Sequence, residues 1–291
     1  MRAITDGGLE TTLIYHHGAT LPDFAAFVLL EDEAGLDLLR TYYAPYIEIA
    51  RRERVRAILD TPTWRANADW GARLGYNEAA LAEVNRRAVE LLREMCSNSP
   101  DVEIAISGCI GPRGDGYVVG ETMTAEETEG YHAQQVRALT GADLVSAITM
   151  THPSEAIGVV RAARSTDMPV VISFTVETNG ELPNGQALAD AVAEVDAATD
   201  GAAEYFMVNC AHPSHFAHVL PVERVMGVRA NASKMSHAEL DAAEELDEGD
   251  PAELAQDYAL LGRLLPLDVV GGCCGTDHRH VGAIAAALSV T

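Results

Sequence analysis

The sequence predicts an α/β fold, a single (β/α)8 TIM barrel over residues 1–291. Short runs of β-forming apolar residues alternate with longer helical stretches along the whole chain, and each kind reaches eight. Strict alternation implies parallel strands joined by crossover helices, and eight units in a chain of this length match a closed barrel. No linker rich in Pro, Gly or Ser divides the sequence, so we expect one domain.

The predicted strands consist mainly of Val, Ile and Ala and do not alternate polar with apolar residues. This pattern is typical of parallel strands that are buried on both faces. The predicted strands are Ala3–Thr5, Arg56–Leu59, Val102–Ser107, Leu144–Thr149, Val170–Thr175, Tyr205–Asn209, Arg224–Arg229 and Leu267–Val270.

Helical patterns fill the intervals between these strands. A doubly wound open sheet is the alternative, but no Gly-x-Gly-x-x-Gly turn follows the first strand. The predicted helices are Asp37–Arg54, Glu78–Cys96, Ala125–Thr140, Ser154–Arg164, Gly185–Ala198, Pro251–Leu265 and Asp277–Leu288, with a weaker one at Pro213–Leu220.

The composition excludes several classes of function. The net charge is −24, from 20 Lys and Arg against 44 Asp and Glu, and nucleic-acid binding needs a basic surface instead. No apolar stretch reaches the roughly 18 residues that a membrane span needs. The N-terminus lacks the apolar core of a signal peptide, so we expect a cytoplasmic protein whose five cysteines are reduced.

One segment is strongly acidic. Residues 239–257 carry nine acidic residues and no basic one. Asp250 followed by Pro251 is typical of a helix N-cap and first turn. We therefore predict a solvated loop that leads into a helix.

The barrel prediction brings distant residues together. Active sites of such barrels lie at the carboxyl ends of the strands, and polar or reactive side chains occur at those ends here. They are Asp6, Asp60, Thr61, Ser107, Cys109, Thr149, Thr175, Asn209, Cys210, Asn231, Cys273 and Cys274.

Three of these residues are cysteines with the chemistry of a metal site. Cys210 follows the sixth predicted strand, and Cys273 and Cys274 lie between glycines after the eighth. Three thiolates with an open fourth position would make a catalytic zinc site. Three buried core cysteines, or a strained disulfide between the adjacent pair, are the alternatives.

Several motifs resemble those of the homocysteine S-methyltransferase family. They are Asp6-Gly7-Gly8, Val208-Asn209-Cys210-Ala211-His212-Pro213 and Gly271-Gly272-Cys273-Cys274-Gly275-Thr276, with further similarity at residues 108–112, 141–144 and 172–174. The resemblance implies a (β/α)8 barrel that holds Zn²⁺ through Cys210, Cys273 and Cys274. It also implies an S-methyltransferase, which moves a methyl group from a small sulfonium or quaternary ammonium donor to a zinc-activated thiol. The family acceptor is homocysteine, which links the family to methionine biosynthesis.

The resemblance assigns Asp6, Gly7 and Gly8 to the substrate site, where the two glycines contact the acceptor. It breaks down at the fourth strand, where Ile148 stands in place of the family acid that binds the homocysteine ammonium. Glu177 and Asp60 are the nearest candidates to bind that ammonium instead. A member with a different thiol acceptor, or a zinc-binding regulatory protein without turnover, therefore stays open.

The remaining predicted substrate contacts are Asp60, Trp64, Thr149 and Asn209. Trp64 could enclose the cation of a methyl donor by cation–π attraction, or simply pack against Trp70 or Tyr76. No catalytic residue is predicted beyond the zinc centre. The predicted partners are a small-molecule thiol and a methyl donor, with no nucleic acid and no membrane, and a homo-oligomer is left open.

Overall fold

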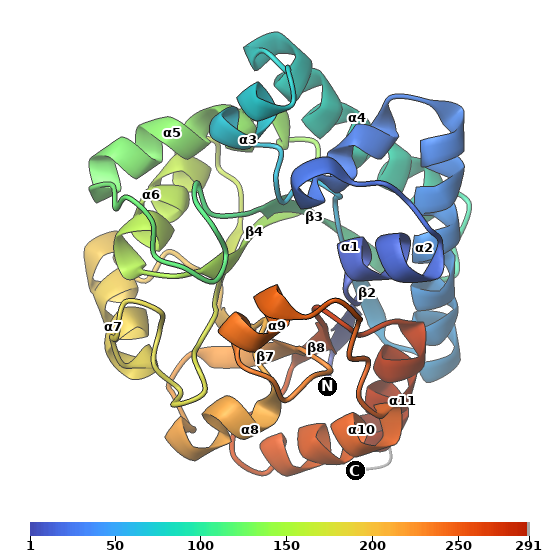
Figure 1. Ribbon diagram of the computed structural model, residues 1–291, viewed down its shortest axis with the longest axis vertical. Helices are drawn as coiled ribbons and strands as arrows, with labels where there is room; N and C mark the ends of the chain where they lie inside the picture. The colour runs from blue at the N-terminus through green and yellow to red at the C-terminus, as the bar shows by residue number, and fades with distance from the viewer. Residues whose placement is uncertain (290–291) are drawn as a thin grey trace.

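The computed structural model describes residues 1–289, which form a closed barrel of eight parallel strands in chain order (Figure 1). β8 pairs with β1 and closes the barrel, so the predicted (β/α)8 fold is confirmed. The strands are β1 (Ala3–Thr5), β2 (Arg56–Asp60), β3 (Ile104–Ile110), β4 (Leu144–Met150), β5 (Val170–Phe174), β6 (Phe206–Asn209), β7 (Val225–Ala230) and β8 (Val269–Gly272).

Helices surround the barrel and also cover one end of it. Within residues 1–289 they are α1 (Leu9–Thr11), α2 (Glu33–Glu53), α3 (Ala68–Arg73), α4 (Glu78–Ser97), α5 (Ala125–Ala138), α6 (Pro153–Arg164), α7 (Leu188–Thr199), α8 (Pro213–Phe216), α9 (His237–Ala242), α10 (Pro251–Leu261) and α11 (His278–Ser289). Short helical turns occur at Thr12–His16, Pro22–Phe24, Ala26–Leu30 and Ala217–Val219. None of the described helices is long and apolar enough to cross a membrane.

The strand ends differ from the prediction in two places that matter for the site. β3 continues to Ile110 instead of stopping at Ser107, so Cys109 lies within the strand and faces the barrel mouth. β8 begins at Val269 and continues to Gly272, which brings Cys273 directly after the strand. Both extensions follow from pairing, because Ile110 pairs with β4 and Gly272 pairs with β7.

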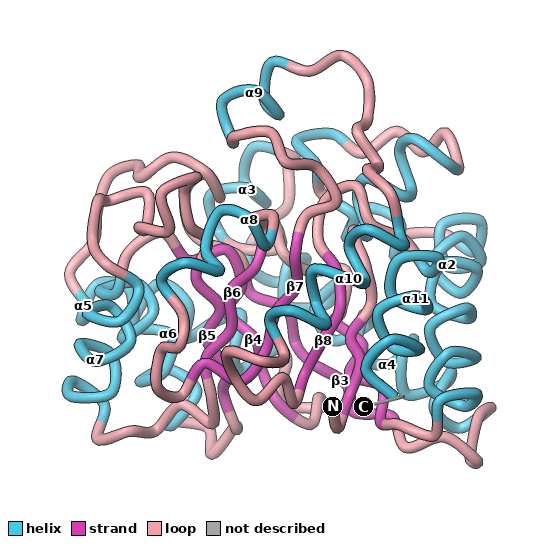
Figure 2. The backbone as a smooth tube through the Cα atoms, turned by 90° about the horizontal axis from the view of Figure 1, so that it is seen from below, coloured by secondary structure: helices cyan, strands magenta, loops and turns pink. Residues whose placement is uncertain are grey.

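The short helices that sequence periodicity did not predict gather at the carboxyl ends of the strands. In Figure 2, α3 and α9 lie on the side of the barrel opposite the two chain termini. α9 and the loop after it belong to the acidic segment, and they stand above the ends of β7 and β8. The short helices and the loops beside them therefore build up a mouth at the carboxyl ends of the strands.

Two apolar layers support the mouth. A small cluster fills the barrel interior, and a large one packs between the sheet and the outer helices. Gly227 in β7 leaves room for Met207, whose side chain would lie 2.8 Å from a Cβ built at that position. The interior cluster consists of Ala3, Ile58, Ala105, Val171, Met207 and Val269.

Candidate active site

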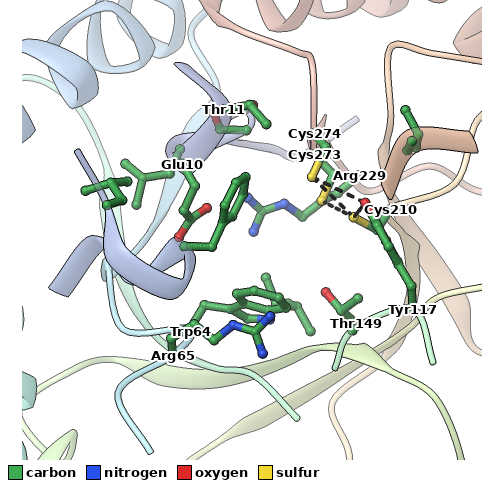
Figure 3. Close-up of a pocket in the computed structure, with 18 of the residues that line it drawn as sticks. Glu10, Thr11, Trp64, Arg65, Tyr117, Thr149, Cys210, Arg229, Cys273 and Cys274 are labelled. Atoms are coloured by element: carbon green, nitrogen blue, oxygen red, sulfur yellow. Dashed lines mark hydrogen bonds between the residues drawn. The ribbon is translucent and has the colours of Figure 1, made fainter. Parts of the chain in front are cut away.

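The three predicted metal ligands converge at the mouth of the barrel (Figure 3). The Sγ atom of Cys210 lies 3.0 Å from that of Cys273 and 3.6 Å from that of Cys274. All three sulfur atoms lie within 4.8 Å of one another. Among residues 1–289, this is the one group of three or more Cys, His, Asp or Glu side chains with such spacing.

The backbone conformation at and beside the cysteines directs their three sulfur atoms toward one another. Cys210 has a φ of 58°, in the left-handed region that a non-glycine residue rarely adopts. Its carbonyl accepts hydrogen bonds from Asn231 Nδ2 at 3.0 Å and from His237 Nε2 at 2.8 Å. After Cys274, the turn needs the positive φ of 77° at Gly275. Fixed strain of this kind concentrates at functional sites.

Polar groups surround the sulfurs. The Tyr117 hydroxyl lies 3.4 Å from Cys210 Sγ and 3.6 Å from Cys274 Sγ. Asn209 Nδ2 lies 3.8 Å from Cys273 Sγ. Hydrogen bonds from Cys210 and Cys274 hold the pKa of Cys273 well below its usual range. Contacts with the neighbouring thiols and burial raise the pKa of the Cys210 and Cys274 thiols, so the negative charge is favoured on Cys273.

The geometry fits zinc. Four-coordinate zinc with zinc–sulfur bonds of about 2.3 Å would separate its sulfur ligands by about 3.8 Å. The separation of 3.6 Å between the Cys210 and Cys274 sulfurs lies close to that value, and the 3.0 Å between the Cys210 and Cys273 sulfurs is shorter than it. A set of three soft sulfur ligands without an oxygen ligand also favours zinc over magnesium or calcium.

A cavity of about 630 Å³ opens beside the three cysteines. Its lining includes nearly all of the predicted substrate residues: Asp6, Gly7, Gly8, Asp60, Trp64 and Thr149. Asn209 is fully buried and does not line the cavity. Its side chain instead accepts from Thr149 N at 2.9 Å and Ser173 Oγ at 2.7 Å, so Asn209 connects β4, β5 and the Cys273 sulfur.

The floor of the cavity contains a buried ion triad that sequence reasoning missed. Arg229 in β7 donates to Asp6 Oδ1 at 2.6 Å and also to Asp60. All three side chains are buried. Burial raises the pKa of Asp6 to about 8, against the lowering effect of Arg229. One guanidinium thus faces two buried carboxyl groups.

Trp64, the predicted cation–π contact for a methyl donor, already stacks with a cation of the protein itself, the Arg65 guanidinium. The Arg65 guanidinium lies 4.2 Å from the centre of the Trp64 ring and 3.6 Å from that of Trp70. Gly116 packs on the same Trp64 indole, since a Cβ at that position would lie only 2.9 Å from Trp64 Cζ2. Trp64 therefore packs against Trp70 through Arg65 while it also lines the cavity.

Glu10 is a second residue that sequence reasoning missed. It lies in α1, two residues after the Asp6-Gly7-Gly8 motif, and it lines the cavity opposite the cysteines (Figure 3). Burial raises the pKa of its carboxyl to about 7. The position of Glu10 just after the glycines was the available signal, but the sequence does not reveal the short helix that turns the side chain inward.

Ile148 and the acidic segment complete the lining. Ile148 is 9% exposed and faces the cavity, as expected from its place near the end of the fourth strand. Glu177 does not line the cavity, and its carboxylate lies 3.1 Å from His237 Nδ1. The acidic segment supplies Asp241, Glu245 and Asp247 to the rim. The predicted solvated loop is therefore also part of the mouth.

The fold and the three-cysteine cluster define a (β/α)8 barrel with a group of sulfur ligands at its mouth that could hold a metal ion. The family model for Homocysteine S-methyltransferase matches residues 3–288. The chain belongs to the homocysteine S-methyltransferase family.

Known relatives are distant. The chain is 23% identical to Homocysteine S-methyltransferase 3 of Arabidopsis thaliana, over 99% of this chain and 90% of that protein. It is 25% identical to the Methionine synthase of Mycobacterium leprae (strain TN), over 99% of this chain but only 24% of that protein. The chain thus spans about a quarter of one relative and most of the other.

Solved structures share the fold. The oxidised form of the homocysteine methyltransferase MmuM from Escherichia coli superposes with a TM-score of 0.75 at 22% identity, covering 98% of this chain and 95% of that one. The metallated form of MmuM gives a TM-score of 0.74 at 21% identity, covering 98% and 96%.

Proposed function

We propose that this protein is a zinc-dependent S-methyltransferase, which moves a methyl group from a small sulfonium or quaternary ammonium donor to a thiol. The observation that carries the proposal is the cluster of Cys210, Cys273 and Cys274 beside a cavity of about 630 Å³. Membership of the homocysteine S-methyltransferase family supports it.

Zinc would supply the means to ionise the acceptor thiol at neutral pH. A free thiol with a pKa near 8.5 is only about 3% ionised at pH 7, and coordination to zinc deprotonates it. Cys210, Cys273 and Cys274 would hold the ion. Tyr117 and Asn209 place a hydroxyl and an amide N–H beside the sulfurs, and these donors would stabilise the negative charge of the three thiolates.

The transfer itself balances charge between the two substrates. A bond forms between the acceptor sulfur and the methyl carbon, while the bond from that carbon to the donor heteroatom breaks. The electron pair stays on the donor heteroatom, so an anionic thiolate and a cationic donor both become neutral. The cavity assists by holding the two in line, which is the main source of rate in such a displacement.

The rim of the cavity suits a cationic donor. Asp241, Glu245 and Asp247 line its mouth, and the chain as a whole carries a net charge of −24. A negative cleft raises the local concentration of cations and speeds their association. This supports a sulfonium or quaternary ammonium donor over an anionic one.

The first experiment combines metal analysis with labelled methyl donors. Purified protein should contain about one zinc ion per chain, and Cys273→Ser should lower that content several-fold because one of three thiolate ligands is lost. Zinc-loaded protein should then transfer labelled methyl from a sulfonium or betaine donor to homocysteine or another small thiol.

Cys96→Ser is the matched control, since Cys96 lies on α4, outside the cluster. It should keep both zinc and transfer. Zinc content that Cys273→Ser leaves unchanged would refute the metal site. A zinc protein that transfers methyl only to thiols other than homocysteine would identify a different acceptor. Zinc without transfer to any thiol would identify a binding protein instead.

A further inference from the structure

We infer that Glu10 binds the ammonium group of a thiol-bearing α-amino acid acceptor, in place of the acid that Ile148 has replaced. This inference rests on the proposed methyl transfer to a thiol and names the chemical class of that thiol. It follows from the charges that line the cavity and from the partners that each already has.

The fourth strand offers no carboxylate to an ammonium group in this protein. Ile148 faces the cavity with an apolar side chain. Its neighbour Thr149 is held by Asn209, whose Nδ2 donates to Thr149 Oγ1 at 2.9 Å. A charged group left without a partner in such a site would be costly, so a carboxylate elsewhere must receive the ammonium.

The candidates that the sequence favoured are already engaged. Asp60 and Asp6 both pair with Arg229. Glu177 pairs with His237 and lies outside the lining. A cation that approached any of them would compete with a partner already in place.

Three acidic residues nearer the rim of the cavity also have side-chain or backbone partners. Asp23 pairs with Arg73 at 3.0 Å, and the Asp115 carboxylate accepts from Tyr117 N at 2.7 Å. Asp247 accepts from Ser233 Oγ at 2.6 Å. The two other acids, Asp241 and Glu245, are exposed at the rim, where water screens their charge.

Glu10 differs from all of these. It is half-buried, its side chain projects into the cavity (Figure 3), and within residues 1–289 it forms no ion pair with another side chain. Burial raises the pKa of this carboxyl to about 7, and the charges of Arg65 and Arg229 offset that effect only in part. A bound ammonium would supply the missing counter-charge.

The location of Glu10 also suits the acceptor. α1 begins immediately after Gly8, and a Cβ built at Gly8 would lie 2.5 Å from the Cys273 carbonyl oxygen. This close backbone approach ties α1 to the strand end that carries two of the three cysteines. Glu10 is therefore fixed relative to the place where the acceptor sulfur must lie.

Calorimetric titration of the zinc-loaded protein tests the inference without measuring turnover. The ligands are L-homocysteine and 4-sulfanylbutanoic acid, which keeps the thiol and carboxylate but lacks the ammonium. The protein should bind homocysteine roughly 10- to 100-fold more tightly, as expected for a hydrogen bond between charged groups. In Glu10→Gln this preference should fall to about threefold or less, with the affinity for 4-sulfanylbutanoic acid unchanged.

Glu244→Gln is the matched control. It removes the same charge from the acidic segment at a residue that does not line the cavity, and it should keep the preference. Zinc content and circular dichroism confirm that each variant is folded and loaded.

The outcomes separate the two proposals. Equal affinity of the unmodified protein for both thiols, or a preference that survives in Glu10→Gln, would overturn the role of Glu10 and leave methyl transfer to a thiol intact. Failure of the zinc-loaded protein to bind either thiol would instead refute the proposed function, and the role of Glu10 with it.

Discussion

Arg229 is the residue on which the charge balance of the barrel interior depends. It is buried with Asp6 and Asp60, and its Nε also donates to the Gly272 carbonyl at 3.2 Å. The guanidinium thus joins β1, β2, β7 and β8 below the cavity. Removing one member of a buried ion group leaves the others without compensation, which is usually more costly than never having had the group.

Arg229→Met should therefore lower the free energy of unfolding by about 3–5 kcal/mol, because two carboxyl groups remain buried without a cation. Urea denaturation followed by circular dichroism measures the change. The triple variant Asp6→Asn/Asp60→Asn/Arg229→Met should recover a large part of the loss. A loss below about 1 kcal/mol in the single variant would show that water already compensates these charges.

The position of a side chain at the barrel mouth can be predicted from the sequence where the residue lies at the end of a strand. The three cysteines and Asp6, Asp60 and Thr149 all reach the mouth because strand ends can be located from apolar runs. Arg229 and Glu10 were missed for different reasons. An arginine inside a buried strand contradicts the apolar pattern, and Glu10 depends on a helix of three residues that has no periodicity to detect.

At the scale of single elements, contacts of Asp277 stabilise the N-terminus of helix α11. The Asp277 carboxylate accepts from Arg279 N at 2.8 Å and pairs with the Arg279 side chain at 2.7 Å. His280 Nδ1 lies 3.0 Å from Asp277 Oδ1. Hydrogen bonds from His280 and Arg279 hold the pKa of Asp277 well below its usual value, although burial opposes them. Asp277 is thus an N-cap with a charged partner.

Asp277→Ala should lower the free energy of unfolding at pH 7 by about 1 kcal/mol or somewhat more. The folded pKa lies below the unfolded value of 3.8, so the stabilisation is complete above that pH and is lost as the pH falls towards the folded pKa. Unfolding free energies of the two proteins, measured from pH 7 down to about pH 2, should therefore begin to converge only as the pH falls below about 4. A difference that stays constant with pH would show that the cap acts without its charge.

Element boundaries were predicted less accurately than element types. The eight strands were all found, but β3 and β8 end later than their apolar runs suggest, because strand pairing extends past the last Val or Ile. The predicted helix at Pro213–Leu220 is a short α-helix, Pro213–Phe216, followed by a turn of 3-10 helix. Helices α1, α3 and α9 escaped prediction because six residues or fewer carry almost no periodic signal.

At the scale of the whole molecule, the excess of negative charge is the dominant feature. The chain has 44 acidic residues against 20 basic ones. Surface ion pairs such as Arg40 with Glu33 and Arg51 with Asp101 neutralise some of these acidic residues. The remaining carboxylates repel one another, and this repulsion opposes the compact state.

Salt should therefore stabilise the protein. Raising NaCl from about 0.01 M to about 0.1 M shortens the screening length from about 30 Å to about 10 Å, so the melting temperature should rise by a few degrees. Differential scanning calorimetry measures it, and sucrose at equal osmolality separates screening from a general solute effect. A melting temperature that falls with salt would mean that attractive ion pairs outweigh the repulsion.

The closing of the barrel has a consequence for how the site arises during synthesis. Gly8 and Cys273 touch across the seam between β1 and β8, so the first and last parts of the chain build one wall of the cavity. Glu10 leaves the ribosome long before Cys273 and Cys274 do. Until residues 269–274 are added, the growing chain holds a single member of the three-cysteine cluster, Cys210, and lacks the strand β8 that closes the sheet. The three-cysteine cluster and the cavity wall beside it are therefore complete only when β8 has joined β1 and the ring of strands is closed.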